Sequence, residues 1–416
     1  MRHFKKLSRV LAAAATALAV GAGAVSASSY PEFLLTASDP IEGAEFGRSI
    51  AVDGDCVVVG AAEGSDDAAV GPGAAYVFRT IGNEYVQEAK LVAPDAELGA
   101  EFGRAVAVQG NTIVVGARFA SSGGVERAGA AYVYRKTRGA WTFEQKVTAG
   151  DSLPEDNFGR AVAIENDVLV VTARKEDISV ANDGAAYVFR KTGRGWEQEA
   201  KLTASDATDE ARFGQSVAAR GNLVIVGARD ADGPVADGAG AVYLFSRFGD
   251  QWVEFAKLTA SDGAVGDQFA FNLAVDGNVI AVGARRADPF GRKDAGAVYL
   301  FELHGNQWYE IGKLTASDAR AGDELGHSVA MSGDFVAVGA RRADISGKKD
   351  QGAVYVFRRS GNHWEEEAKI QASDGEAGDE FGHSLSVHGN RIAVGANVAD
   401  FAEINQGAAY VYQLKE

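Results

Sequence analysis

One unit repeats about every 56 residues along the sequence, and this period limits the possible folds more than any other feature. A Phe-Gly pair or a close variant marks each unit, at Phe46-Gly47, Phe102-Gly103, Phe158-Gly159, Phe213-Gly214, Phe269-Ala270, Leu325-Gly326 and Phe381-Gly382. The first residues of these pairs are separated by 56, 56, 55, 56, 56 and 56 positions. The copies fill the chain from about residue 33 onward, so we expect one repeat domain with no second domain or long linker.

Two further positions repeat without variation. An aspartate stands seven residues before each pair, at Asp39, Asp95, Asp151, Asp206, Asp262, Asp318 and Asp374. A tyrosine follows a Gly-Ala-x sequence in each unit, at Tyr76, Tyr132, Tyr187, Tyr243, Tyr299, Tyr355 and Tyr410. A residue that every unit needs indicates a structural role, and we expect the aspartates to cap the turns that enter each unit.

Each unit is predicted to contain four short strands, named A to D. In the first unit the apolar runs 48–52 and 56–61 form strands A and B, separated by a tight turn at Gly54-Asp55. Strand C follows at 74–78, and strand D extends from Tyr85 to about residue 92. Strands A and B are apolar on both faces, as strands packed between neighbouring sheets are. Strand D is amphipathic, which is typical of an outer edge.

These units predict an all-β fold, a seven-bladed β-propeller with four antiparallel strands in each blade. The last unit stops after strand C, at Tyr410-Val411-Tyr412. The segment 33–39 resembles the end of strand D in other units, for example 257–262. We therefore expect the N-terminal strand, within residues 33–38, to complete blade 7 and close the ring, which removes two open sheet edges.

Residues 1–27 have the order of a signal peptide. Basic residues come first, an apolar run follows from Leu11 to about Val25, and Val25-Ser26-Ala27 fits a signal peptidase site. A permanent membrane helix is the weaker interpretation, because the run is short and rich in alanine and glycine. Residues 28–416 then form the propeller, with no membrane span, in a secreted, periplasmic or cell-surface protein.

Charge and cysteine content limit the possible partners and the cellular compartment of the protein. The formal net charge of −16 argues against a nucleic-acid partner, whose binding proteins carry a basic surface. Cys56 is the only cysteine, so no intrachain disulfide can form. An exported protein of this size without disulfides fits a bacterial origin better than an animal ectodomain.

The repeats resemble the FG-GAP repeats of the integrin α-subunit head and of many bacterial secreted proteins. Besides the Phe-Gly pairs, the resemblance rests on triplets at Gly60-Ala61-Ala62, Gly116-Ala117-Arg118, Gly227-Ala228-Arg229, Gly283-Ala284-Arg285, Gly339-Ala340-Arg341 and Gly395-Ala396-Asn397. Blade 3 has Thr172-Ala173-Arg174, and the proline of the family name is absent from every triplet. The resemblance implies a seven-bladed propeller that takes part in adhesion or ligand recognition.

The resemblance also raises the question of calcium, which integrin-type repeats often bind in an acidic loop between strands A and B. Here that connection is a tight turn, so no blade has room for such a loop. The nearest acidic cluster is Asp230, Asp232 and Asp237 in a B–C loop, with solvated loop charge as the favoured interpretation and a calcium site as the alternative. We expect no metal and no cofactor.

Candidate binding residues lie on the face that carries the B–C and D–A connections, which are longer and more variable than the A–B and C–D turns. The position two residues after each Phe changes around the ring and holds Arg48, Arg104, Arg160, Gln215, Phe271, His327 and His383. We expect this collar position to surround the mouth of the central channel and to bind anions, together with Arg285 and Arg341. The alternative is that each cation pairs with a loop carboxylate such as Glu45, Glu101 or Asp379.

These observations predict a recognition or adhesion module that binds an extracellular protein or an acidic glycan through the B–C/D–A face. The alternative is a propeller enzyme acting on extracellular polysaccharide, such as a lyase that uses His and Arg near the axis. The sequence assigns no catalytic residue, because His327 and His383 have no paired nucleophile. We also expect these histidines to gain charge near their usual pKa of ~6.5, and so to tighten binding at mildly acid pH.

Overall fold

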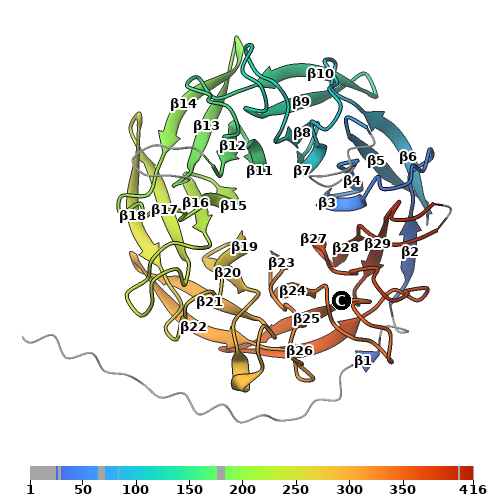
Figure 1. Ribbon diagram of the computed structural model, residues 1–416, viewed down its shortest axis with the longest axis vertical. Coiled ribbons are helices and arrows are strands. Elements are labelled where there is room, and N and C mark those ends of the chain that lie inside the picture. Colours follow the sequence, from blue (N-terminus) through green and yellow to red (C-terminus); the bar gives the residue numbers. More distant parts are fainter. Residues whose placement is uncertain are drawn as a thin grey trace, which may run out of the picture.

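The computed structural model describes residues 25–26, 30–63, 71–82, 84–175, 183–401 and 403–415. Seven antiparallel sheets surround a central axis as the blades of a propeller (Figure 1). Each blade has the four strands that the repeat pattern predicts, so the all-β, seven-bladed fold is confirmed. Among the described residues we found no helix with the length and hydropathy of a membrane span.

The strands occupy matching positions in every unit. The A strands, next to the axis, are β3 (Phe46–Asp53), β7 (Phe102–Gln109), β11 (Phe158–Glu165), β15 (Phe213–Arg220), β19 (Phe269–Asp276), β23 (Ser328–Ser332) and β27 (Ser384–His388). The B strands are β4 (Cys56–Ala61), β8 (Thr112–Ala117), β12 (Val168–Ala173), β16 (Leu223–Ala228), β20 (Val279–Ala284), β24 (Phe335–Ala340) and β28 (Arg391–Ala396). The C strands are β5 (Ala74–Ile81), β9 (Ala130–Thr137), β13 (Ala185–Thr192), β17 (Ala241–Phe248), β21 (Ala297–His304), β25 (Ala353–Ser360) and β29 (Ala408–Gln413).

The D strands form the outer edges of the blades. They are β6 (Glu84–Leu91), β10 (Ala140–Val147), β14 (Gly195–Leu202), β18 (Gln251–Leu258), β22 (Gln307–Leu314), β26 (His363–Ile370) and β2 (Glu32–Leu35). A short 3-10 helix, η2 (Pro289–Gly291), lies in the B–C loop of blade 5. Strands A to C follow the prediction closely, although strand C extends three residues further in blade 1.

The ring closes through the N-terminal strand, as predicted. β2 pairs antiparallel with β29, with Glu32 opposite Tyr412 and Leu35 opposite Ala409. The strand begins one residue earlier than expected and ends at Leu35 rather than at residue 38. Glu32 accepts hydrogen bonds from the Tyr412 hydroxyl at 2.8 Å and from the Ser373 hydroxyl at 2.6 Å, which ties blade 7 to blade 6.

Most of the predicted signal peptide lies outside the described residues. Only Val25–Ser26 of this segment is described, as strand β1, which runs parallel to β26 at the outer edge of blade 6 (Figure 1).

Neighbouring blades approach each other so closely near the axis that five of the seven contacts join two glycines, with Thr172 and Ala270 at the other two. A Cβ atom on Gly60 would lie 2.1 Å from the carbonyl oxygen of Gly103 in the next blade. Gly103 itself has a φ of +97°, a conformation that side chains rarely adopt, and its Cβ would lie 2.3 Å from Ala74 O. The two glycines belong to the Gly-Ala triplet and the Phe-Gly pair, so the repeated motifs exist because of this contact.

A hydrogen-bonded tie fixes each D–A connection to the blade that it enters. The Tyr76 hydroxyl donates to Asp39 at 2.9 Å, and Lys90 Nζ donates to the other carboxylate oxygen at 2.7 Å. Blades 2 to 6 have the same tie, and in blade 7 the tyrosine donates to Asp374 while Leu34 stands at the lysine position. The aspartates therefore join strands C and D to the connection, a role beyond the turn capping that we expected.

Deletion of β2 tests ring closure. Removing residues 32–35 leaves the edge of β29 without a partner, and each lost hydrogen bond costs ~0.5–1.5 kcal/mol net. We expect a lower melting temperature, measured by differential scanning fluorimetry, and more aggregation, measured by light scattering. Deletion of residues 1–29, which keeps β2, serves as the control; equal melting temperatures for the two deletions would contradict ring closure.

Acid is expected to weaken the repeated ties. Burial opposes ionisation of six of the aspartates, but hydrogen bonds from the lysine and the tyrosine outweigh it and hold the pKa below its usual value at Asp39, Asp95, Asp151, Asp206, Asp262 and Asp318. A carboxyl whose pKa is lower in the folded chain than in the unfolded chain stabilises the fold above its unfolded pKa, and this stabilisation disappears as the pH falls. The melting temperature should therefore decrease below about pH 4.

The variant Asp206→Asn/Asp262→Asn provides the matched comparison for this pH dependence. At neutral pH it should melt at a lower temperature than the parent protein. On acidification its melting temperature should fall by less, because two of the titrating carboxyls are gone. If the melting temperatures of the two proteins fall by the same amount on acidification, other groups control the pH dependence.

Candidate functional site

A cavity of about 560 Å³ lies at the centre of the ring, on the face that carries the B–C and D–A connections. All seven collar residues line it, and so do Arg285 and Arg341. The structure thus brings every predicted site residue into one cavity: Arg48, Arg104, Arg160, Gln215, His327, His383, Arg285 and Arg341.

A local irregularity at the start of each A strand positions the collar. In blade 1 the register between β3 and β4 shifts between Phe46 and Ser49, so Gly47 and Arg48 do not pair with β4. Blades 2, 4 and 5 have the same shift, and in blade 3 it is one residue longer, from Phe158 to Val162. In blades 6 and 7 the regular strand begins only after the collar residue. Such bulges turn a side chain away from the sheet surface, here toward the axis.

A second circle of arginines lines the same cavity, and the sequence analysis recognised only part of it. The third position of the Gly-Ala triplet, which follows strand B, holds Arg118, Arg174, Arg229, Arg285 and Arg341 in blades 2 to 6. Arg118, Arg174 and Arg229 were seen only as motif residues. The sequence feature that could have identified them is an arginine repeated at one motif position, in the same units as the variable collar position. Together with Arg48, Arg104 and Arg160, eight arginines face the cavity.

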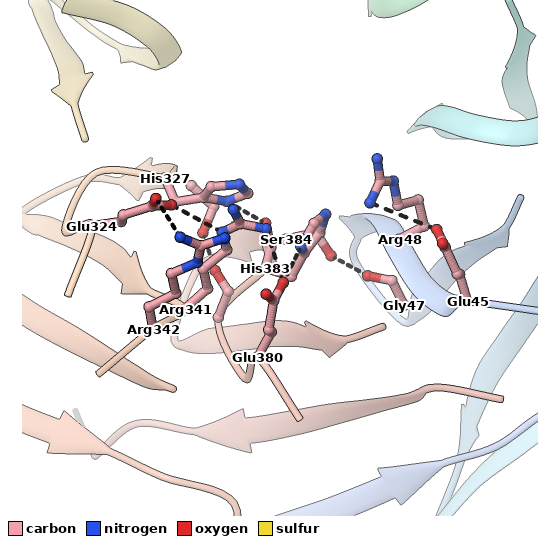
Figure 2. A network of polar contacts seen from close by, with 12 residues as sticks. Glu45, Gly47, Arg48, Glu324, His327, Arg341, Arg342, Glu380, His383 and Ser384 are labelled. Carbon is pink, nitrogen blue, oxygen red and sulfur yellow. Dashed lines mark hydrogen bonds and ion pairs between the residues drawn. The ribbon is translucent and has the colours of Figure 1, made fainter. Parts of the chain in front are cut away.

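Glutamates placed directly before the Phe positions neutralise part of this charge. Arg118 donates two hydrogen bonds to Glu101, at 2.6 and 2.7 Å, while Arg104 lies 3.7 Å from the same carboxylate. Arg48 lies 3.6 Å from Glu45 (Figure 2). The alternative of internal ion pairs therefore holds for these two collar arginines, although both contacts are long.

In blades 6 and 7, Arg341 bridges two such glutamates. Its Nε lies 3.1 Å from Glu324 and its Nη1 lies 2.8 Å from Glu380 (Figure 2). Asp379, the third carboxylate considered from the sequence, instead accepts a hydrogen bond from the backbone N–H of Glu376 at 2.7 Å. Asp379 therefore supports its own loop.

The collar residues of blades 5 to 7 form a row of rings. The rings of Phe271 and His327 are 5.0 Å apart, and those of His327 and His383 are 4.8 Å apart. His327 Nδ1 donates to the carbonyl oxygen of His383 at 3.1 Å, and the guanidinium of Arg285 lies 3.9 Å from the Phe271 ring. This sector of the cavity wall is therefore packed and internally bonded.

The charge of the cavity shifts the titration of its own residues. Burial, followed by the nearby charge of Arg341, lowers the pKa of His327 well below 6.5, and burial with Arg48 does the same for His383. Both histidines therefore resist protonation more than an exposed histidine does. The expectation that they gain charge near pH ~6.5 is wrong, because it ignored burial beside arginines.

The arginines are affected in the same direction. Burial and the charges of neighbouring arginines lower the pKa of Arg104 and Arg160 well below the usual value. Since arginine stays protonated in proteins, this direction means that the protonated groups repel one another in a poorly solvated place. A bound anion would relieve that repulsion.

The acidic cluster considered as a calcium site has other partners. Asp230 accepts Arg212 at 2.7 Å and Arg229 at 3.1 Å, and Asp232 accepts the backbone N–H of Gly238 at 2.8 Å. Within the described ranges, no three His, Cys, Asp or Glu residues are grouped as a metal site would require. Independence from calcium stays a prediction.

Comparison with solved structures shows the fold alone. One similar chain belongs to a "Crystal Structure of Mitotic Checkpoint Complex", with 12% sequence identity and a TM-score of 0.57. The similarity covers 97% of this chain and 100% of that chain. No curated protein matches the sequence.

The family comparison is more specific. A model described as FG-GAP repeat matches seven segments, at residues 33–78, 85–134, 141–189, 196–245, 252–301, 308–357 and 364–412. FG-GAP propellers generally mediate protein interactions, and these repeats are typical of extracellular proteins. Each match begins in the D strand of one blade and ends in the C strand of the next. Because the seven matches cover most of the sequence, the chain belongs to the FG-GAP repeat family.

Proposed function

We propose that the protein is an exported recognition module that binds another protein through its B–C/D–A face. An acidic side chain of the partner enters the central cavity, and apolar residues around it contact the partner's surface. The observation that carries this proposal is the cavity itself, where eight arginines converge. The carboxylates that the structure describes form ion pairs with only some of these arginines.

The exposed apolar residues favour a protein partner. In the described part of the chain, large apolar side chains are exposed on the loops of this face, at Ile41, Val92, Leu98, Leu153, Val235, Val265, Phe290, Phe401 and Ile404. Three of them are more than 70% exposed, at 74% for Leu98, 78% for Val265 and 76% for Phe290. The turns of the opposite face expose Ile81 and Phe248. Arginine surrounded by apolar residues is typical of the energetic centre of protein interfaces.

An acidic glycan is the alternative ligand, since uronate and sulfate groups also bind arginine pairs. The apolar residues argue against it, because a charged glycan offers them little apolar surface. The lyase hypothesis has one supporting observation, the two histidines that line the cavity beside arginines. It predicts that incubation with acidic polysaccharide releases unsaturated sugars, detected by their ultraviolet absorbance.

Export depends on the first 27 residues, which carry the basic, apolar and small-residue order of a signal peptide. The full-length chain produced in a bacterial host should therefore leave the cytoplasm and start at Ser28. Intact mass measurement of the exported protein checks this. A chain that retains Met1 in the membrane fraction would contradict it.

Binding to arrays of extracellular proteins and of acidic and neutral glycans tests the recognition proposal. The triple variant Arg48→Ala/Arg104→Ala/Arg160→Ala removes cavity charge, and Leu98→Ser/Val265→Ser/Phe290→Ser removes apolar contacts from the same face. We expect each to weaken binding to acidic proteins by about tenfold or more. The arginine variant loses charge-assisted bonds worth ~1.5–3 kcal/mol each, and the other variant loses apolar side chains whose full burial is worth ~1.5–3 kcal/mol each. A chelator in the binding buffer should change nothing.

The control is Ile81→Ser/Phe248→Ser, which removes the same kind of side chain from the opposite face. It should bind as the parent protein does, and melting curves should show that all variants are folded. Loss of binding in the control, or retention in both test variants, would contradict the proposal. Binding restricted to acidic glycans would replace the protein partner by the glycan.

A further inference from the structure

The arginines of the second circle follow a regular contact rule. Each can contact the residue directly before the Phe position in its own blade, 17 positions earlier, and the corresponding residue in the next blade, 39 positions later. Arg341 meets a glutamate at both places, Glu324 and Glu380. Arg285 meets Gln268 at 2.7 Å in its own blade and Glu324 at 3.3 Å in the next.

The rule fails to supply a carboxylate at Arg174 in blade 3. The position before its own Phe holds Asn157, and the corresponding position in blade 4 holds Arg212. Arg174 has one long side-chain hydrogen bond, 3.4 Å from Nη1 to Gln215 Oε1, and no ion pair within the described residues. In blade 4, Asp230 provides the carboxylate and forms ion pairs with Arg212 and Arg229.

Arg160, the collar residue of the same blade, also has no carboxylate partner among the described residues. Across the described residues its guanidinium forms neither an ion pair nor a hydrogen bond, and its buried Nε has no partner. The Nε of Arg174 and the Oδ1 of Asn157 are also buried without a partner. Burial and the charges of Arg104 and Arg174 lower the pKa of Arg160 well below the usual value, while burial lowers that of Arg174 to about 10.

Blade 2 shows how this site is filled when a carboxylate is present. There Glu101, at the position that corresponds to Asn157, binds Arg118 through two hydrogen bonds of 2.6 and 2.7 Å. It also lies 3.7 Å from the collar residue Arg104. One carboxylate thus serves the two arginines that correspond to Arg174 and Arg160.

We propose that a carboxylate of the ligand binds between Arg160 and Arg174, in the place that Glu101 occupies in blade 2. This inference rests on the proposed function and deepens it, because it assigns the partner's acidic side chain to one sector of the cavity. The ligand group is the carboxylate of an aspartate or glutamate, which two guanidinium groups can bind through several hydrogen bonds at once.

The variant Asn157→Glu tests the inference by restoring the missing glutamate. The backbone accepts this residue, because Asn157 has a φ of 63° and Glu101 has a φ of 54°. The new carboxylate should bind Arg174 and Arg160, raise the melting temperature and occupy the ligand's place. Binding of the blocked tripeptide acetyl-Ala-Asp-Ala-amide, measured by calorimetry, should weaken by at least about tenfold. Its Asn counterpart should not bind the parent protein.

Gln268→Glu is the matched control. It adds the same charge in blade 5, beside Arg285, which already contacts Glu324. Tripeptide binding should weaken by less than about threefold, because the charge is added away from blade 3. A second variant, Arg174→Gln, should lose binding by about tenfold while the rest of the cavity stays charged.

The inference is overturned if the parent protein does not distinguish the Asp from the Asn tripeptide. It is also overturned if Asn157→Glu and Gln268→Glu weaken binding equally, or if Arg174→Gln binds as before. The proposed function is tested separately with a protein ligand. If Asn157→Glu still binds this ligand but Leu98→Ser/Val265→Ser/Phe290→Ser does not, the blade 3 site is refuted. The proposal that the B–C/D–A face binds a protein would then still stand.

Discussion

The contact between glycines of neighbouring blades is the constraint on which the rest of the structure depends. At Gly60, Gly116 and Gly339 an added Cβ would lie within 2.1–2.2 Å of a carbonyl oxygen in the next blade. No side chain can separate the inner strands there, so the A strands converge around the axis. The same contact occurs where the ring closes, between Gly395 and Gly47, at 2.0 Å. Five of the seven junctions join two glycines, and Thr172 and Ala270 stand at the other two. Together the seven junctions bring one position from each blade into a shared cavity.

This convergence explains why identical and variable positions of the repeat have different roles. The tyrosine and aspartate positions bond within each unit, and each unit needs the same tie. The collar and triplet positions instead meet their counterparts from other blades, so their identities combine into one surface. Where the chain places a glutamate beside them, as at Glu101 and Glu324, the arginines are held by internal ion pairs. Where it places Asn157, Arg160 and Arg174 form no ion pair with any carboxylate in the described part of the chain.

The architecture could be predicted well from the sequence because each structural feature occurs in seven copies of the repeat. Blade number, strand order and closure by the N-terminal strand all followed from the spacing and from the incomplete last unit. The collar was found because its variation contrasts with its constant neighbours. Arg118, Arg174 and Arg229 were missed as cavity residues because their triplet had been interpreted only as a motif. The lowered pKa of His327 and His383 could not be predicted from the sequence, because it depends on their burial and on the arginines that the fold places beside them.

A crystal structure of the protein with the aspartate tripeptide tests the central claim most directly, since that claim concerns the place of one negative charge. The account predicts a carboxylate within hydrogen-bond distance of both Arg160 and Arg174. Arg341 should keep its two glutamates, as in the free protein. A carboxylate bound elsewhere in the cavity, or a carboxylate of the protein itself between Arg160 and Arg174, would contradict the account.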